Sequence, residues 1–337
     1  MNLLGNRNVV IIAAAVIIVF AILNALDMGN QTFAGFSTDP NNTVIQVRPD
    51  SPAVQAGFAV GDRIVMNGGI AVTDSKALSR RARPEVGESR EWVIERNGEQ
   101  QTLTLTYSGL PSRQRGLNIM GLLTGLAFLV FGLWPFAKGA DRTRSLLALV
   151  SISFALLWIG TPYLSSYALR TAVGVLFLPI LLLGFAGLLH FIMSFPQSNP
   201  WLEKANAMKL LYGPALLLSV YIIVLNLLQP DGTSTLNTIN NIVIGLFFVA
   251  YFGLCMFHMV RTFTRASPEQ RSAHGLNVMV LGVVLALLPI LVGIVVNIVA
   301  PQVVLPGSDY FGVTFILMPL AFAYAVLRTP PAEAVAA

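Results

Sequence analysis

Long apolar runs separated by short polar loops make up most of the chain, and one long polar segment lies near its start. A helix needs about 20 apolar residues to cross a hydrocarbon core of about 30 Å. Eight runs reach that length, and we expect each to form a membrane-spanning helix: residues 9–26, 117–137, 145–167, 171–195, 210–228, 241–261, 276–300 and 311–327. The first predicted span precedes the polar segment, and the other seven follow it in close succession.

The polar segment predicts a small domain that mixes strands with short helices. Ser51 suits a helix N-cap, Pro52 suits the first helical position, and Gly57 suits the left-handed position that ends a helix. Asn97 and Gly98 form the strongest short hairpin signal. Runs of β-branched and alternating residues predict strands at 43–47, 63–66, 91–96 and 101–107, and helices are expected at 52–56 and 75–83.

Composition places the chain among integral membrane proteins. It has 337 residues, of which 55% are hydrophobic and 11% charged, with a mean hydropathy of +0.71. Soluble domains carry about 25% charged residues. The net charge of +5 comes from basic residues in short loops, so membrane topology explains it better than a nucleic-acid partner. The single cysteine, Cys255, allows no internal disulfide and no thiolate metal site, and we expect neither a metal nor a cofactor.

The basic loops predict the orientation of the spans, because loops rich in Lys and Arg lie on the cytoplasmic side. One alternating set of loops holds Arg7, Lys138, Arg142, Arg144, Lys204, Lys209, Arg261, Arg265, Arg271 and Arg328. The opposite set holds Arg170, with Arg113 and Arg115 directly after the predicted domain, where the rule is weaker. We therefore expect both termini in the cytoplasm and the polar domain outside it. The first span is expected to be an uncleaved anchor; a cleaved signal peptide, the alternative, leaves this orientation unchanged.

The segment from Ser51 to Ile64, with the sequence SPAVQAGFAVGDRI, resembles the core signature of a PDZ domain. PDZ domains are peptide-binding modules. In that family a short loop with apolar residues around glycine precedes the strand that pairs with the peptide. The segment Phe33–Phe36 is similar to that loop.

This resemblance implies a specific binding groove. The amides of Ala34, Gly35 and Phe36 would bind a carboxylate, and the strand that begins near Phe36 would pair with an added peptide strand. The second predicted helix would form the other wall, with Leu78 and Arg81 facing the ligand. The alternative is a spacer domain that binds nothing, in which Phe33 and Phe36 are ordinary core residues.

The peptide from His190 to Pro196, with the sequence HFIMSFP, ends the fourth predicted span. A structural interpretation accounts for it, because Pro196 ends the helix and two aromatic residues lie at the interface. His190 would then hydrogen-bond to a neighbouring helix. The functional alternative makes His190, Phe191, Phe195 and Pro196 a ligand or switch site in the bundle, since histidine titrates near neutrality.

The form His-Phe-x-x-x-Phe-Pro is similar to one in the membrane input module of certain bacterial sensors. Met318–Arg328 resembles the last span of that module, and Pro268–Arg271 also fits. These sensors include competence-type quorum-sensing histidine kinases and membrane serine phosphatases, several of which carry a PDZ-like domain after the first span. Their bundles are followed by a cytoplasmic catalytic domain. This chain stops nine residues after Arg328, so we expect a sensor-like bundle without that catalytic output.

The residue types inside the spans argue against a pump and against catalysis. Apart from Arg261, the last residue of the run 241–261, no Asp, Glu, Lys or Arg falls within a predicted span, whereas ion pathways and proton relays use such groups. The His-Glu-x-x-His spacing of zinc proteases is absent, and the Gly-x-Ser of rhomboid-like proteases does not occur in the spans. We therefore expect that the chain is not an enzyme.

The predicted fold class is a mainly helical polytopic membrane bundle of one plus seven spans, with a small extracytoplasmic α+β domain similar to a PDZ domain. Residues 1–29 form the N-terminus and anchor span, 30–112 the outer domain, 113–328 the bundle and 329–337 a cytoplasmic tail. We expect a non-enzymatic receptor of a bacterial inner membrane that binds a peptide or protein segment outside and signals to a separate cytoplasmic protein. Two alternatives stay open: an adaptor for membrane proteolysis, secretion or envelope quality control, and a carrier of an apolar solute.

Overall fold

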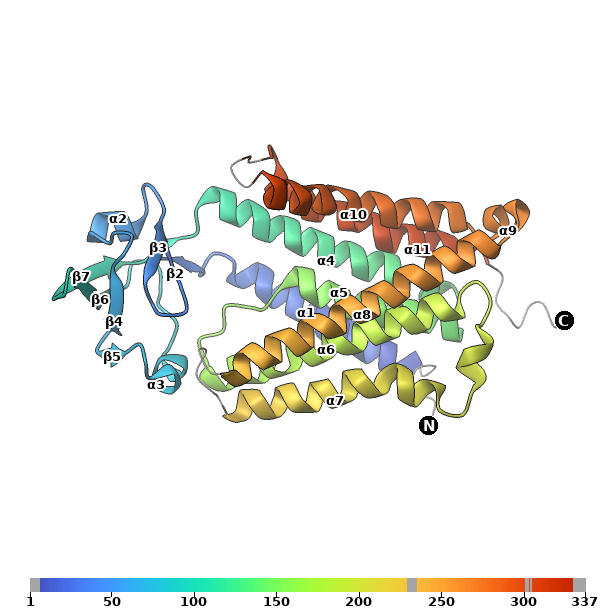
Figure 1. The fold of residues 1–337 in the computed structure, drawn as a ribbon, viewed down its shortest axis with the longest axis horizontal. Coiled ribbons are helices and arrows are strands. Elements are labelled where there is room, and N and C mark those ends of the chain that lie inside the picture. The colour runs from blue at the N-terminus through green and yellow to red at the C-terminus, as the bar shows by residue number, and fades with distance from the viewer. Residues whose placement is uncertain (1–6, 229–234, 301–302, 304, 330–337) are drawn as a thin grey trace.

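The computed structural model describes residues 7–228, 235–300, 303 and 305–329. Long helices run side by side along one axis, and a small β-rich domain lies at one end of them (Figure 1). Residues 1–6 and 330–337, which include most of the predicted cytoplasmic tail, lie outside the described residues.

Eight helices in the described part of the chain are long and apolar enough to cross a membrane. They are α1 (Arg7–Asp27), α4 (Ser112–Lys138), α5 (Arg142–Ile159), α6 (Tyr167–Ser194), α7 (Ala207–Leu228), α8 (Thr235–Arg265), α10 (Leu276–Val299) and the segment Ser308–Arg328. In that last segment a 3-10 helix (Ser308–Ile316) leads into α11 (Leu317–Arg328). A 3-10 helix (Pro200–Glu203) and the short α9 (Pro268–Ala273) connect helices at the end opposite the β-rich domain.

Each apolar run predicted as a span is helical, and two differ from their predicted form. The third run was expected to continue to residue 167, but α5 ends at Ile159. Gly160 has a positive φ of 73° and Pro162 follows it, so the helix cannot continue. The last run begins as a 3-10 helix rather than an α-helix.

Glycines bring α4 and α5 into backbone contact. A Cβ on Gly125 would lie 2.9 Å from the carbonyl oxygen of Ala155, and one on Gly132 would lie 2.1 Å from Cβ of Ser151. The Gly121-x-x-x-Gly125 spacing therefore serves packing within this chain, since small residues let helices approach closely.

The β-rich domain contains three sets of paired strands. Strands β5 (Ile70–Ala71), β4 (Arg63–Asn67), β6 (Ser89–Arg96) and β7 (Glu99–Thr106) form an antiparallel sheet in that order. Strand β2 (Phe36–Thr38) pairs with β3 (Val44–Val47), and β1 (Thr32–Phe33) pairs with β8 (Ser108–Gly109). Helix α2 (Pro52–Ala56) and helix α3 (Ser75–Arg80) complete it. Its buried core is made by Val44, Ala53, Phe58, Ile64, Trp92, Ile94, Leu105 and Tyr107.

Several local predictions for this domain are confirmed. The Ser51 side chain accepts a hydrogen bond from the amide of Val54, as an N-cap does, and Gly57 ends α2 with a φ of 88°. Asn97 and Gly98 join β6 to β7 with φ values of 55° and 83°, the left-handed pair that a two-residue hairpin requires. The second predicted helix, α3, is shorter than expected and ends at Arg80.

A buried carboxylate fixes the loop before β4. Asp62 is 1% exposed, and its two oxygens lie 2.7 and 2.8 Å from Nε and Nη2 of Arg96 on β6. The amide of Ala59 donates to the same carboxylate at 2.7 Å, and Arg96 also donates to the carbonyl of Gly57. Burial alone would raise the pKa of Asp62, but the hydrogen bonds and charge of Arg96, with the Ala59 amide, hold the pKa below its ordinary value.

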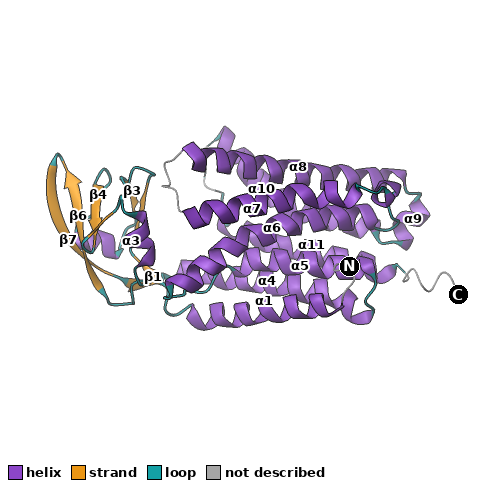
Figure 2. Ribbon diagram, turned by 90° about the horizontal axis from the view of Figure 1, so that it is seen from below, coloured by secondary structure: helices purple, strands orange, loops and turns teal. Residues whose placement is uncertain are grey.

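The two faces of the domain differ in what they meet. Strands β2 and β3 and helix α3 lie on the side toward the bundle, and β6 and β7 lie on the far side (Figures 1 and 2). Any ligand held between β2 and α3 would therefore lie close to the ends of the long helices.

Candidate functional site

Strand β2 has one free edge. It pairs with β3 on one side, where Phe36 lies opposite Val47 and Ser37 opposite Gln46. No strand among the described residues pairs with its other edge. An unpaired edge offers backbone N–H and C=O groups to an incoming strand. The strand is only three residues long, and its register shifts between Ser37 and Thr38.

The loop before β2 is held in one conformation by its carbonyl groups and by Gly35. The carbonyl oxygen of Ala34 accepts from the amide of Ala53 at 2.9 Å, and that of Gly35 accepts from the amide of Arg48 at 2.8 Å. Gly35 has a φ of 93°, and a Cβ there would lie 2.1 Å from Cβ of Ser51. The position therefore requires glycine for both conformation and space.

The two phenylalanines of this loop have different surroundings. The ring of Phe36 stacks on Phe58 with centroids 4.9 Å apart and meets Trp92 edge-on at 5.4 Å. Its side chain thus belongs to the core, and only its backbone lies on the free edge. The half-buried Phe33 lies under the guanidinium of Arg48, which is 5.6 Å from the ring centroid. Arg48 places a positive charge beside the loop, a feature that the sequence analysis did not single out.

Helix α3 begins at a side-chain cap and contains Leu78, and Arg81 follows directly after it; both residues were predicted to face a ligand. Oδ1 of Asp74 accepts from the amide of Ala77 at 2.9 Å. Leu78 is half-buried on this helix. The guanidinium of Arg81 lies on the β4–β5 turn instead, where Nη1 donates to the carbonyl oxygens of Asn67 at 3.0 Å and Gly68 at 3.4 Å.

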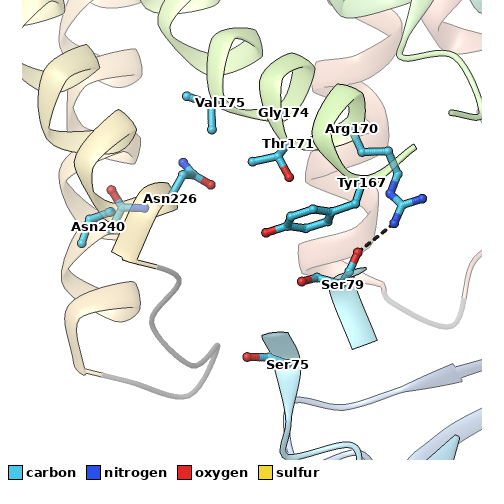
Figure 3. A pocket seen from close by; sticks show the side chains of 10 residues that line it. Ser75, Ser79, Tyr167, Arg170, Thr171, Gly174, Val175, Asn226 and Asn240 are labelled. Atoms are coloured by element: carbon cyan, nitrogen blue, oxygen red, sulfur yellow. Dashed lines mark hydrogen bonds between the residues drawn. The ribbon is translucent and has the colours of Figure 1, made fainter. Parts of the chain in front are cut away.

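Arg170 of α6 connects this helix to the bundle. Its Nη2 donates to the carbonyl oxygens of Ser79 at 2.7 Å and Arg81 at 2.8 Å, and Figure 3 shows the first of these bonds. Its Nη1 donates to the carbonyls of Leu164 and Ser165, at 3.1 and 2.7 Å, in the α5–α6 loop. The last carbonyls of a helix have no partner within the helix, so a side chain of the bundle satisfies the Ser79 carbonyl near the end of α3 and the Arg81 carbonyl directly after it.

Tyr163 forms a second connection beside the first. Its hydroxyl donates to the carbonyl oxygen of Pro84 at 3.0 Å and lies 2.7 Å from Oγ1 of Thr32 on β1. Because a tyrosine hydroxyl has one proton, the Thr32 hydroxyl is the donor in the second bond. The guanidinium of Arg83 lies 4.6 Å from the Tyr163 ring centroid. The segment that follows α3 is thus attached to the bundle at several points.

A polar cavity of about 510 Å³ lies between α3 and the bundle. Figure 3 shows the side chains around it, which come from α3, α6, α7 and α8. They include Ser75, Ser79, Tyr167, Thr171, Asn226 and Asn240. Oδ1 of Asn240 is buried and has no hydrogen-bond partner among the described residues. The boundary between domain and bundle is therefore polar, and space remains in it.

At the opposite end of the bundle, His190 joins three helices. It is fully buried, with Nε2 3.2 Å from Nη2 of Arg142 on α5 and Nδ1 3.0 Å from the hydroxyl of Tyr212 on α7. A guanidinium can only donate, so Nε2 accepts and the proton of the neutral ring is on Nδ1. This arrangement agrees with the structural interpretation of the histidine, a hydrogen bond to neighbouring helices.

The other members of that motif pack against one another. Phe191 stacks on Phe195 with centroids 5.8 Å apart and meets Phe322 of α11 at 5.5 Å. Both Phe191 and Phe195 are buried. Pro196 follows a cis peptide bond and borders a cavity at this end of the bundle. Packing thus accounts for the two aromatic residues.

Comparison with known proteins identifies the domain. Residues 32–106 match the family model of the PDZ domain, so the chain contains a PDZ domain that runs from β1 to β7. The match ends before α4 and does not extend to the bundle. No curated protein gave a match to this chain. Within the described residues, no three or more His, Cys, Asp and Glu side chains lie close enough together to hold a metal ion.

Proposed function

We propose that this chain is a non-enzymatic membrane receptor whose PDZ domain binds an extended peptide or protein segment between β2 and α3. The free edge of β2 supports this proposal, because PDZ domains bind peptides by adding a strand to an exposed sheet edge. Leu78 on α3 would supply the apolar contact on the opposite wall. Arg48, beside the loop at Phe33, would supply a positive charge for a carboxylate.

The geometry of β2 limits what such a ligand can gain. Only Phe36–Thr38 are available for pairing, and a register shift follows Ser37. Few backbone hydrogen bonds can therefore form, so we expect modest affinity with little dependence on sequence beyond the residues near Arg48 and Leu78. Strand β2 and helix α3 lie on the side of the domain toward the bundle (Figure 1), so the ligand would be a segment that approaches the membrane surface.

The observation that carries the receptor proposal is the attachment of α3 to α6. Arg170 bonds to the carbonyls of Ser79 and Arg81, and Tyr163 bonds to that of Pro84. A ligand that displaced α3 would therefore act on the first turn of α6 and on the α5–α6 loop. Helices of the bundle would pass this displacement to a separate cytoplasmic protein at the loops 138–144, 196–209 and 261–275.

The proposed placement is a bacterial inner membrane with the PDZ domain outside the cytoplasm. It is supported by the helices of membrane-crossing length and by the basic residues at the loops opposite the PDZ domain. These basic residues are Lys138, Arg142, Lys204, Lys209, Arg261, Arg265 and Arg271. Positively charged loops stay in the cytoplasm.

A peptide-library selection on the full chain in lipid nanodiscs tests the proposal. We expect enrichment of peptides with an apolar C-terminal residue and a free carboxylate, and weaker binding after C-terminal amidation or after Arg48→Gln. Leu78→Ser should also weaken binding, whereas Thr104→Ser on the far strand β7 should leave it unchanged. The proposed binding site would be contradicted if the library yields no binder, or if the three variants bind the selected peptides with equal affinity.

A further inference from the structure

A second cavity, of about 590 Å³, opens at the end of the bundle opposite the PDZ domain. Its walls come from the end of α6, the α6–α7 loop, the end of α8 and the α9–α10 junction. Lys204, Arg261 and Arg265 line it, together with His258 and His274. No Asp or Glu is among the described residues of its lining. The cavity therefore carries a net positive charge.

Glu203, next to Lys204, is exposed and does not line the cavity, and two other acidic side chains at this end of the bundle are engaged elsewhere. Asp141 pairs with Arg144 at 3.4 Å, and Glu269 accepts from the hydroxyl of Ser267 at 2.7 Å. No carboxylate of the described residues forms an ion pair with the three cations of the cavity. Like charges four residues apart on a helix repel each other, and Arg261 and Arg265 have that spacing on α8. Positive charge at this end agrees with the proposed orientation of the bundle, but that orientation does not require the charges to surround one cavity.

Arg271 shows what a structural arginine at this end does. Its Nε donates to the carbonyl oxygens of Phe263 at 2.8 Å and Ala266 at 3.0 Å, and its guanidinium lies 4.3 Å from the ring centroid of Phe263. It thereby satisfies the end of α8. Arg261 and Arg265 are therefore not required for that purpose.

The basic cavity adjoins an apolar one of about 430 Å³. The two share Met193, Asn199, Trp201, His258 and Arg261 as lining residues. The apolar cavity continues between α6, α7 and α8. There it is lined by the apolar side chains Leu189, Leu210, Leu211, Pro214 and Leu254. A charged chamber at the end of the helices thus leads into a hydrocarbon-lined chamber along their sides.

We propose that this pair of cavities binds an anionic phospholipid, with its phosphate at Arg261 and Arg265 and part of an acyl chain beside Leu211 and Leu254. Basic pockets between membrane helices bind phosphate head groups, and guanidinium groups form charge-assisted bonds to phosphate. The adjoining apolar chamber selects a lipid over a soluble phosphate, which has nothing to place there. This site is separate from the PDZ groove and does not depend on the proposed receptor function.

Fluorescence of Trp201 tests the proposal, because this residue lines both cavities. Trp134, an exposed residue of α4, is first replaced with Phe. This variant of the full chain is titrated in detergent micelles with phosphatidylglycerol that carries brominated acyl chains, and the further substitution Trp201→Phe isolates the signal of Trp201. We expect quenching at much lower concentrations of phosphatidylglycerol than of brominated phosphatidylcholine. Equal quenching by the two lipids would overturn the proposal.

Charge variants separate binding from packing. Arg261→Gln/Arg265→Gln should weaken phosphatidylglycerol binding by about 30-fold, since each basic residue near an anionic surface contributes about 1 kcal/mol. Arg261→Lys/Arg265→Lys should keep most of the affinity. Lys209 is an exposed basic residue outside the cavity, so Lys209→Gln should keep all of it. Unchanged affinity in the double glutamine variant would overturn the assignment. So would thermal stabilisation by inorganic phosphate without any by phosphatidylglycerol, because the ligand would then be a soluble anion.

Discussion

The guanidinium of Arg170 donates to the carbonyl oxygen of Ser79 across 2.7 Å, from the first turn of α6 to the last turn of α3. This bond joins the bundle to helix α3, the proposed wall of the groove opposite β2. Two charge-assisted hydrogen bonds from the same side chain, one exposed and one partly buried, hold the end of α3 and the residue after it. The orientation of the groove wall is therefore tied to the orientation of α6.

Replacing Arg170 with Gln should loosen α3 while the PDZ core stays folded. The loss of two hydrogen bonds to carbonyls, each contributing about 1 kcal/mol, should raise amide exchange in residues 79–84 by about 10-fold or more. Hydrogen-exchange mass spectrometry of the full chain measures this. The control is Arg80→Gln, which removes an exposed charge from α3 itself and should leave the exchange unchanged.

Tyr163→Phe should act on the same segment through a different contact. It removes the bonds to Pro84 and Thr32 and keeps the ring beneath Arg83, so we expect a loss of about 1 kcal/mol in the local opening free energy. Because Tyr163 and Arg170 hold one short segment, the double variant should deviate from additivity by about 0.5 kcal/mol or more. Strict additivity in the exchange of residues 81–84 would show that the two contacts are independent.

Gly35→Ala should destabilise the PDZ domain more than Gly69→Ala does. Both positions have positive φ, 93° and 80°, which costs a residue with a Cβ about 1–2 kcal/mol. Only at Gly35 would the new methyl group collide with Ser51, so we expect an additional loss of about 1–3 kcal/mol. Hydrogen exchange of the β6 and β7 amides in the full chain measures both losses of stability. Equal losses in the two variants would rule out the close packing of Gly35 against Ser51.

The Asp62–Arg96 pair should make the stability of the domain depend on acid. The folded-state pKa of Asp62 lies below its ordinary value of 3.8, so its contribution is complete above that value and is lost as the pH falls through the folded-state pKa. Asp62→Asn should cost about 2 kcal/mol at neutral pH and flatten this acid dependence. This acid dependence is measured by hydrogen exchange of the β6 amides between about pH 5 and 2, the range in which the carboxylate becomes protonated, with a correction for intrinsic exchange rates. A variant that keeps the same acid dependence would assign it to another group.

The parts that sequence predicted best are those that neighbouring residues determine. Ser51, Gly57 and the Asn97–Gly98 turn each depend on residues only a few positions away, so the sequence predicted their roles as helix caps and as a hairpin turn. The apolar runs indicated the long helices for the same reason, and the PDZ signature indicated the small domain.

The parts that sequence did not predict depend on distant contacts. Arg170 lies 91 residues from Ser79, and Tyr163 lies 79 from Pro84. No local pattern indicates such pairs. Arg170 binds the carbonyls of Ser79 and Arg81, where α3 ends earlier than predicted. The side of β2 that Phe36 faces was also undetermined, since a three-residue strand with a register shift gives no reliable alternation.

Site-specific photocrosslinking in living cells is the sharpest test of peptide binding between β2 and α3. A photoreactive residue at Leu78 lies on the proposed groove wall, and one at Thr104, exposed on β7, lies on the far side of the domain. We expect capture of a peptide or protein segment from Leu78 and not from Thr104, with capture reduced by Arg48→Gln. No capture from Leu78 in cells that express the full chain, or equal capture from Leu78 and Thr104, would contradict binding between β2 and α3.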